Sequence, residues 1–319
     1  MADDMLQFGR AILHDEARAL DELADSLDGP FEDAVRLILG CKAKLIVSGL
    51  GKSGHVARKI AATFASTGTT ATFLHLAEAI HGDLGMASDG DVAILISQSG
   101  ETPELEPVVD HFREAGIPII AITGNGASML AKAAAAALLL PHWPEVGPES
   151  VAPTTSTTMT LALGDALAMT VMRQKGFTRT DFGRLHPGGA LGARLKAVSR
   201  LMHTGDALPL TSEASSMHDT IVEMSAKRLG IVGVVDEAGY LIGAITDGDL
   251  RRHIEQGLDH EAAEFMTRDP KTILPDALVD DALGLFEEYR ITALFVVEPG
   301  EGGKKPVGVL HIHDCPPAR

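Results

Sequence analysis

Hydrophobic positions along the chain fall into two kinds of pattern, helical spacing and short continuous runs. In residues 1–40 apolar and charged positions alternate at helical spacing, which predicts one or two amphipathic helices. Short apolar runs follow, each typical of a buried strand. They are AKLIVSGLG (43–51), TATFLHL (70–76), DVAILIS (91–97), IPIIAIT (117–123) and AAALLLP (135–141).

Helical stretches separate or follow these runs. KSGHVARKIAATFAST (52–67) and PELEPVVDHFREAG (103–116) have helical character, and residues 154–176 predict a long apolar helix. That helix begins with hydroxyl residues and has Gly176 as its stop. Strands that alternate with helices of this length form a parallel sheet with helices on both faces. The predicted fold class is therefore α/β, with a doubly wound parallel sheet.

The chain repeats itself after about residue 200. Met202 aligns with Met266, and Gly243 aligns with Gly308. Each copy predicts a short strand, a helix, two strands joined by a turn (residues 237–239 in the first copy), and then a strand that runs into a helix. One copy is too small to be stable alone, so the two copies should pack face to face.

These patterns predict four segments. Residues 1–40 form helices that pack on the first domain, residues 41–197 form that domain, and residues 202–260 and 266–319 are the two copies of the repeat.

Composition and charge limit the classes of function. A hydrophobic content of 45% excludes a disordered chain, and a net charge of −17 argues against nucleic acid as a partner. The apolar run AAAAALLL is too short to span a membrane, and the first residues lack a signal pattern. Cys41 and Cys315 lie far apart and suggest neither a disulfide framework nor a zinc knuckle. We expect a soluble, cytoplasmic protein without a membrane partner.

Candidate chemistry gathers in two turns, GLGKSGH (49–55) and SQSGETPEL (97–105), each joining the carboxyl end of a strand to a helix. Ligands bind at that edge of an open parallel sheet. Helix-start amides, with the hydroxyls of Ser53, Ser97, Ser99 and Thr102, can bind a phosphate group. Helix capping explains one such residue, but it is a poor explanation for four of them at two adjacent strand ends. Neither turn matches a Walker loop or a dinucleotide fingerprint.

These two turns and the segment SVAPTTSTTMTLALGDALAM (150–169) resemble a sugar isomerase (SIS) domain with a flavodoxin-like sandwich. With HPGGALGARL (186–195) and the repeat, which resembles an α+β pair of CBS domains, the whole chain resembles the D-arabinose-5-phosphate isomerase family. The resemblance implies aldose–ketose isomerisation between D-ribulose 5-phosphate and D-arabinose 5-phosphate through an enediol(ate). It also implies supply of Kdo for lipopolysaccharide biosynthesis, and a homotetramer with pockets shared between subunits.

The family's catalytic positions map to Lys52, Glu104, Glu145 and His186. The reaction needs a base, a donor or cation near the oxygens and an anchored phosphate. We expect His186 and one glutamate to share proton transfer, and the choice of glutamate stays open. Three of the four residues have a structural alternative: Lys52 as a solvated lysine, Glu104 as a partner of the helix dipole, and Glu145 as a solvated loop acid.

Further site residues follow from the resemblance. It places a divalent metal such as zinc at His75, although we expect no required cofactor, and a packed histidine is the alternative. The implied substrate-binding residues are Ser53, Gly68, Thr69, His81, Ser97, Gln98, Ser99 and Thr102.

The repeat resembles modules that bind nucleotide-like ligands. Thr246 and Asp249 match the ribose-holding pattern in the first copy, while His311 and Asp314 occupy those places in the second. We expect a nucleotide or nucleotide-sugar effector, with the first copy better formed. The alternative is that the pair only supports oligomer packing.

Two other functions stay open. A phosphosugar-sensing transcriptional regulator would need a DNA-binding helix-turn-helix, and the first 40 residues are too short and too acidic for one. An isomerase for another phosphosugar would keep the phosphate site, but such relatives typically lack a CBS pair.

Overall fold

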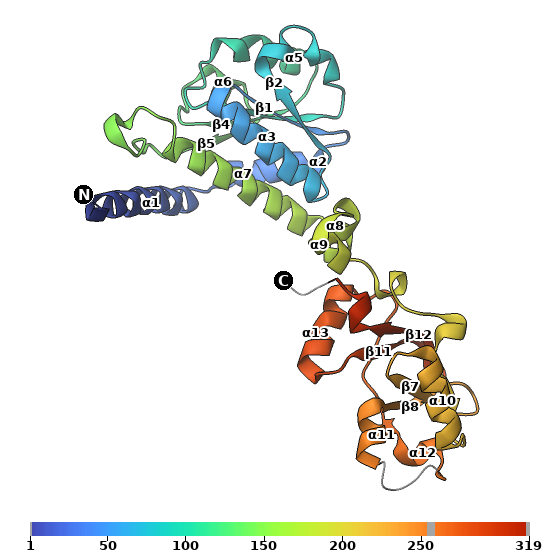
Figure 1. Ribbon diagram of the computed structural model, residues 1–319. Helices are drawn as coiled ribbons and strands as arrows, with labels where there is room; N and C mark the ends of the chain where they lie inside the picture. Colours follow the sequence, from blue (N-terminus) through green and yellow to red (C-terminus); the bar gives the residue numbers. More distant parts are fainter. Residues whose placement is uncertain (1, 254–258, 317–319) are drawn as a thin grey trace. The chain divides into compact units, whose positions relative to one another are not determined.

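The computed structural model describes residues 2–253 and 259–316 (Figure 1). The chain folds into two compact units, Met1–Thr178 and Arg179–Arg319. The division lies nearer the N-terminus than the expected domain end at residue 197, because helices α8 (Arg179–Leu185) and α9 (Gly189–Arg194) belong to the C-terminal unit. Arg179 and Arg194 both pair with Asp280 of that unit.

The N-terminal unit contains a parallel sheet of five strands in the order β2-β1-β3-β4-β5. Each of the five apolar runs forms one of the strands, as predicted. The strands are β1 (Leu45–Gly49), β2 (Ala71–His75), β3 (Val92–Ile96), β4 (Ile119–Thr123) and β5 (Ala136–Leu139). The chain leaves β1 towards β2 on one side and later returns to β3 on the other side. This reversal of strand order opens a crevice at the carboxyl ends of β1 and β3.

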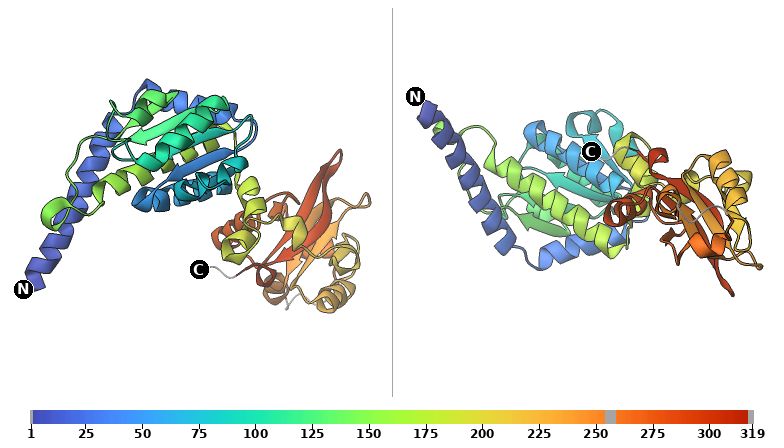
Figure 2. Two further views of the ribbon diagram at one scale, coloured as in Figure 1. Left: turned by 90° about the horizontal axis from the view of Figure 1, so that it is seen from above. Right: turned by 60° about the horizontal axis from the view of Figure 1, so that its bottom comes forward.

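Helices cover both faces of this sheet (Figures 1 and 2). One face is covered by α1 (Ala2–Asp25), α2 (Gly29–Gly40), α3 (Gly51–Ser66) and α7 (Thr155–Gln174). The other face is covered by α4 (Leu76–Ala79), α5 (Glu106–Glu114) and α6 (Met129–Ala133). Within β1, Leu45 and Val47 join the first core and Ile46 joins the second. Because both faces of the sheet are covered, the central strands β1, β3 and β4 are buried at every position rather than alternately, whereas the edge strands β2 and β5 are only partly buried.

The two N-terminal helices confirm the prediction for residues 1–40. The second half of α1 lies against α7 and its preceding loop, where Trp143 Nε1 donates to Glu22 at 2.6 Å. The first half of α1 extends beyond the sheet (Figures 1 and 2). It carries apolar side chains that are between 53% and 71% exposed: Met5, Leu6, Phe8 and Leu13.

The C-terminal unit contains the repeat. The first copy comprises β6 (Leu210–Ser212), α10 (Met217–Lys227), β7 (Ile231–Val235), β8 (Leu241–Thr246) and α11 (Asp247–His253). Helix α12 (Ala262–Phe265) and β9 (Thr267–Arg268) follow, and the second copy continues with β10 (Thr272–Ile273), α13 (Val279–Tyr289), β11 (Ala293–Gly300) and β12 (Gly303–His311). In each copy the second hairpin strand itself runs into the last helical segment. The expectation of a further strand there was wrong.

The two copies pack against each other, and the first residue of each copy contacts the other copy. Met266, which opens the second copy, lies against Gly243 of the first, where a Cβ atom would be 2.3 Å from its sulfur. Met202 lies in the same way against Gly308 of the second copy, at 2.4 Å. Strand β9 pairs antiparallel with β8, and residues of both copies share one core cluster. The prediction that the two copies pack together is therefore confirmed.

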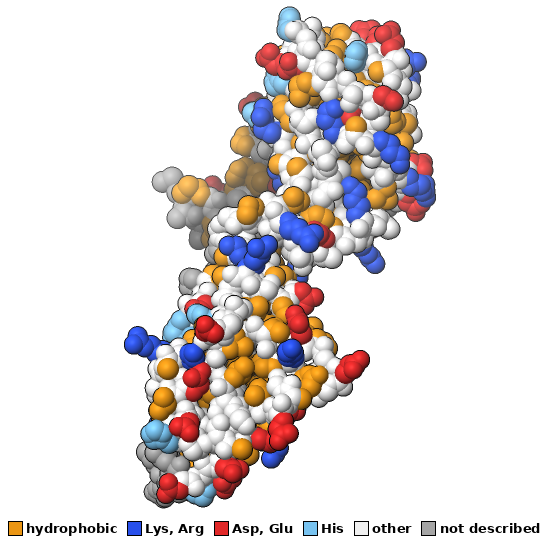
Figure 3. Space-filling model, turned by 90° about the vertical axis from the view of Figure 1, so that its right-hand side faces the viewer, with side chains coloured by type: hydrophobic (Ala, Val, Ile, Leu, Met, Phe, Trp, Pro, Cys, Tyr) orange, Lys and Arg blue, Asp and Glu red, His pale blue; other side chains and the backbone are white. Residues whose placement is uncertain are grey.

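The surface carries charged side chains of both signs. Figure 3 shows Lys and Arg side chains interspersed with Asp and Glu on the face that it presents, without the continuous basic surface that a nucleic acid requires. No helix within residues 2–253 and 259–316 is both long and apolar enough to cross a bilayer.

Candidate active site

A cavity of about 420 Å³ opens at the carboxyl ends of β1 and β3, where the strand order reverses. Half of the residues that line it are predicted site residues from the two turns, and Glu145 is a further predicted site residue. The lining residues are Leu50, Lys52, Ser53, Ile96, Ser97, Gln98, Ser99, Thr102, Glu145, Pro153, Ser156 and Thr157.

The first wall of the cavity is the start of α3. Its N-cap is Leu50, which offers no side-chain cap, and the first main-chain bond of the turn runs from Gly54 N–H to the Leu50 carbonyl. The amides of Gly51, Lys52 and Ser53 therefore precede any intrahelical partner. Unpaired amides at a helix start, together with the helix dipole, favour an anion.

The second wall is the turn after β3, which its own hydroxyls hold in shape. The Ser97 and Thr102 hydroxyls are 2.8 Å apart, and Gly100 N–H donates to Ser97 Oγ at 3.1 Å. Within the described chain the amides of Gln98, Ser99 and Thr102 form no hydrogen bond. The turn therefore presents a second set of open donors, as expected of a phosphate-binding site. We call the two walls the phosphate cradle (residues 50–53 and 97–102).

Gly100 makes this turn possible. Its φ is +66°, and a Cβ atom there would lie 2.2 Å from Ser128 Oγ. Only glycine fits both constraints.

Glu145 lies beside the cradle and caps α7. Its carboxylate accepts from Thr154 N–H at 2.7 Å, Thr154 Oγ1 at 3.2 Å, Ser156 N–H at 3.2 Å and the Ser156 hydroxyl. Burial opposes ionisation, but these hydrogen bonds outweigh it and hold the pKa of Glu145 below its ordinary value. Glu145 is therefore a fixed anion in the cavity wall, and not the solvated loop acid of the alternative interpretation.

The sequence analysis missed the residues that fix this anion. The hydroxyls of residues 154–157 were interpreted only as the start of a helix, yet Ser156 and Thr157 also line the cavity. The available signal was a carboxylate in the loop just before a hydroxyl-rich helix start.

Lys52 and Glu104 lie where the sequence placed them. Lys52 is exposed in the first turn of α3 and lines the cavity. Glu104 lies in the short 3₁₀ turn η2 (Pro103–Leu105) that leads into α5. It is half-buried, does not line the cavity, and its carboxylate accepts no hydrogen bond from the described residues.

Comparison with known proteins agrees with this geometry. A SIS domain profile matches residues 38–170, and a CBS domain profile matches residues 198–256 and 262–315. Arabinose 5-phosphate isomerase KdsD of Pseudomonas aeruginosa is 44% identical over 303 residues, covering 94% of this chain and 92% of the relative. KdsD of Escherichia coli K12 is 41% identical over 315 residues, covering 98% and 95%.

The chain belongs to the arabinose 5-phosphate isomerase family. A solved structure, that of E. coli CFT073 c3406 in complex with arabinose 5-phosphate, is 40% identical, covers 59% of this chain and 100% of its own, and superposes with a TM-score of 0.57.

Not every residue implied by the resemblance joins the cradle of this family member. Gly68 and Thr69 precede β2 and lie at the amino-terminal edge of the sheet. Lys175 Nζ donates to Thr69 Oγ1 at 2.8 Å, and a Cβ atom at Gly68 would lie 2.4 Å from the Phe177 ring. Strand β2, with five residues, is about 17 Å long, so the substrate in one chain's cradle does not reach them. Their implied role in substrate binding, in a pocket that the resemblance shares between subunits, stays a prediction.

His186 belongs to the C-terminal unit of this isomerase-family chain. Its ring stacks on Phe182 with centroids 3.8 Å apart, and its Nδ1 lies 3.0 Å from the Phe182 carbonyl oxygen. Its catalytic role stays a prediction.

His75 and His81 flank α4. His75 ends β2 and packs edge-on to Phe73 at 6.1 Å, and its buried Nδ1 has no hydrogen-bond partner. A zinc site needs three or four ligands, and the described part of the chain brings no three His, Cys, Asp or Glu side chains together for a metal. Within residues 2–253 and 259–316, no full set of zinc ligands therefore meets at His75, and the metal at this residue stays a prediction. His81 is exposed in the turn after α4 and does not line the cradle cavity.

The CBS pair encloses a second cavity, of about 730 Å³, which Thr246, Asp249 and His311 help to line. Thr246 donates to Asp249 Oδ2 through its amide at 2.8 Å and its hydroxyl at 2.7 Å. Burial opposes ionisation of Asp249, but the bonds from Thr246 and Arg252 outweigh it and lower its pKa. In the second copy, His311 N–H donates to Asp314 Oδ2 in the same turn, but Asp314 does not line the cavity.

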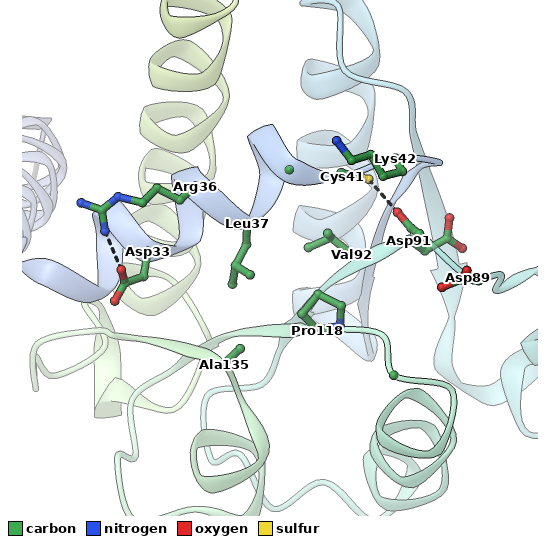
Figure 4. Close-up of a pocket in the computed structure, with 13 residues that line it drawn as sticks. Asp33, Arg36, Leu37, Cys41, Lys42, Asp89, Asp91, Val92, Pro118 and Ala135 are labelled. Atoms are coloured by element: carbon green, nitrogen blue, oxygen red, sulfur yellow. Dashed lines mark hydrogen bonds and ion pairs between the residues drawn. The ribbon is translucent and has the colours of Figure 1, made fainter.

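A third cavity, of about 510 Å³, lies at the opposite, amino-terminal edge of the sheet (Figure 4). Arg36 is paired with Asp33 at 2.6 Å, and Cys41 Sγ lies 3.5 Å from the Gly90 carbonyl oxygen. None of the predicted site residues lines it. It lies away from the cradle and adds nothing to the site.

Proposed function

We propose that this chain interconverts D-ribulose 5-phosphate and D-arabinose 5-phosphate. The observation that carries the proposal is the cradle itself, where two sets of unpaired amides and a lysine meet at the reversal of strand order. A phosphate in the cradle fixes one end of a pentose in a cavity that Lys52 and Glu145 also line. The family relationship and the arabinose 5-phosphate complex of c3406 support this substrate.

The isomerisation moves one proton between neighbouring carbons. In the direction from the ketose, a base takes a proton from C1 while the C1–H electron pair forms the C1–C2 double bond and the carbonyl oxygen at C2 gains a proton. The enediol then loses the proton of its C1 hydroxyl, C1 becomes the aldehyde, and C2 gains a proton. No proton is gained or lost overall.

The two glutamates differ in their fitness as the base. Four donors stabilise the charge of Glu145 and lower its pKa, which makes it a weak proton acceptor. No donor among the described residues bonds to the Glu104 carboxylate. We therefore assign proton transfer to Glu104 and His186, and assign to Lys52 the stabilisation of the oxyanion. A base or acid of this kind contributes about a hundredfold or more to the rate.

Metal-free turnover is part of this proposal, because Lys52 and His186 can stabilise the two oxygens. Protein treated with a chelator should keep its rate, and a rate that is lost and then restored by zinc would contradict metal-free chemistry.

The wider setting is also proposed. The family relationship supports two further parts of the proposal, supply of Kdo for lipopolysaccharide and a cytoplasmic location. We also propose a homotetramer, as the family resemblance implies. The exposed apolar positions in the first half of α1, Met5, Leu6, Phe8 and Leu13, support contact with another subunit, which can cover them. A nucleotide or nucleotide-sugar effector at the CBS pair is supported by its cavity.

The test is turnover of ribulose 5-phosphate in heavy water, followed by arabinose 5-phosphate formation and deuterium at the exchanging carbon. Glu104→Gln and His186→Ala should each lose about a hundredfold or more in kcat with an unchanged unfolding midpoint. Asp110→Asn, an exposed carboxylate of α5 outside the cavity, is the matched control and should keep the rate. Failure of the folded wild-type protein to form product, while it accepts another sugar phosphate, would overturn the substrate assignment.

A further inference from the structure

Two arginines occupy the same strained position in the two CBS copies. Arg228 follows α10 with φ +61° and ψ +27°, and Arg290 follows α13 with φ +52° and ψ +44°. The backbone N–H of each arginine donates to the preceding helix, that of Arg228 to the Met224 carbonyl and that of Arg290 to the Phe286 carbonyl. Glycine is the usual residue at this left-handed position, because it has no Cβ to clash.

The strain is concentrated around one cavity. Among the described residues five non-glycine residues have positive φ, and three of them line the cavity of the CBS pair: Arg228, Asp269 and Arg290. The side chain of Asp269 has a partner in the fold, since its carboxylate accepts from Lys304 Nζ at 2.7 Å. Backbone strain that persists at one site points to a function for the side chain that requires it.

Arg228 and Arg290 have no such partner. No hydrogen bond or ion pair from either guanidinium exists within the described part of the chain, although both line the cavity. The other cations of the cavity are engaged. Arg252 pairs with Asp249, Arg251 Nε donates to the Asp247 carbonyl at 3.3 Å, and Lys271 lies over the Tyr289 ring at 4.3 Å.

The rest of the lining defines the remaining chemistry. The Asp247 carboxylate lies beside Gly230 without a protein partner in the described chain, so it can accept from hydroxyl groups. Ile231, Ala244 and Ile291 supply an apolar wall. The cavity thus combines two free guanidinium groups, one free carboxylate and an apolar surface, in a protein whose net charge is −17.

We infer that Arg228 and Arg290 each bind one phosphate group of a single nucleotide that carries a diphosphate, with Asp247 accepting from its sugar hydroxyls. This assignment specifies the chemical class of the effector, and it rests on the effector site of the proposed function. Guanidinium groups bind phosphate oxygens in pairs and remain charged at every physiological pH. Because one arginine comes from each copy, the ligand must bridge both copies.

Calorimetry on the full-length protein tests this inference. Adenosine, AMP, ADP, GDP, CDP, UDP and inorganic pyrophosphate are titrated separately. At least one nucleoside diphosphate should bind with one molecule per chain, about tenfold or more tighter than AMP, since a charged hydrogen-bonded contact is lost in AMP. Absence of binding by every diphosphate, equal binding of AMP, or two AMP molecules per chain would overturn the inference. Pyrophosphate alone binding as tightly as the best nucleotide would also overturn it.

Arginine-to-glycine variants separate ligand binding from folding. Arg228→Gly and Arg290→Gly should each weaken the diphosphate by about tenfold or more. Their unfolding midpoints should stay or rise, because glycine adopts the left-handed conformation without a Cβ clash. Lys305→Gln removes an exposed charge of the same unit outside the cavity and should change neither quantity. Full affinity in either glycine variant would refute the assignment of that arginine.

Turnover of ribulose 5-phosphate is measured on the same wild-type protein. Protein that binds the diphosphate but does not isomerise the sugar would remove the isomerase assignment and leave this inference. Active protein that binds no diphosphate would remove only the inference.

Discussion

Replacing Glu145 with glutamine tests whether this carboxylate holds the start of α7 as well as facing the substrate. The carboxylate accepts four hydrogen bonds from Thr154 and Ser156. Glutamine has the same shape, but its amide nitrogen is a donor. The four groups that bond to the carboxylate are all donors too, so the side-chain NH2 group of the glutamine must face at least one donor. The negative charge at the helix start is also lost.

The magnitude follows from this count. Three of the four bonds end on Oε2 and one, from the Ser156 hydroxyl, ends on Oε1, so a glutamine that keeps its oxygen at the Oε2 place deprives one donor of its acceptor. The other three bonds then end on a neutral oxygen, and a hydrogen bond to a charged group is worth about 1.5–3 kcal/mol against about 0.5–1.5 kcal/mol for a neutral one. Glu145 is half-buried, so water replaces part of each bond. We therefore expect the free energy of unfolding of Glu145→Gln to fall by about 2–3 kcal/mol at neutral pH. Loss of the anion at the helix start adds about 0.3–1 kcal/mol.

The pH dependence has a definite sign. The folded-state pKa of Glu145 lies below its ordinary value of 4.5, so its stabilising contribution is present above that value and is lost as the pH falls through the folded-state pKa. The difference in stability between wild type and Glu145→Gln should therefore shrink on acidification below pH 4.5.

Urea unfolding at neutral and acidic pH, with kcat and KM at neutral pH, is the assay. Ser156→Ala is the matched control, because it keeps the charge and removes one donor, and it should lose about half as much stability as Glu145→Gln. If Glu145→Gln unfolds like the wild type at neutral pH while its turnover is abolished, the carboxylate serves the chemistry alone and the reasoning is refuted.

Two further substitutions probe the sheet edges. Asp91 has a fully buried carboxylate that accepts from Lys44 Nζ at 2.8 Å and from Lys44 N–H at 3.0 Å. Asp91→Asn should therefore lower the free energy of unfolding, measured by urea titration, by about 3–5 kcal/mol. An unchanged midpoint would show that the protein does not need this buried pair for its stability. Gly100→Ala places a Cβ atom 2.2 Å from Ser128 Oγ and should raise KM for the sugar phosphate about tenfold or more. Gly116→Ala is the control, because Gly116 has a similar φ of +68° but no atom near its Cβ position, and this variant should keep the wild-type KM. Equal KM values in the two variants would argue against a role of the Gly100 turn in binding the phosphate.

Much of the N-terminal unit could be predicted from the sequence because its signals are local. All five strands lie within the apolar runs. The signal is clearest for β1, β3 and β4, since a strand that is buried on both faces is apolar along most of its length. The two cradle turns were recognisable because glycines and hydroxyls directly follow strands. The repeat was recognisable because it carries its own packing residues, such as Met202 and Gly308.

Only the tertiary structure shows which residues far apart in the sequence are in contact, and which residues have an unusual backbone conformation. The order of the strands, which puts β1 beside β3, depends on how the helices pack and not on any one run. The pairing of Glu145 with Ser156 joins a loop to a helix start, and the placement of Thr69 at the far edge of the sheet follows from strand direction. The left-handed backbone of Arg228 and Arg290 leaves no trace in a sequence, since an arginine after a helix is ordinary unless its φ is known. The local sequence determines which helices and strands form. The site residues lie at the ends of these elements, and the packing of the whole unit decides which ends come together.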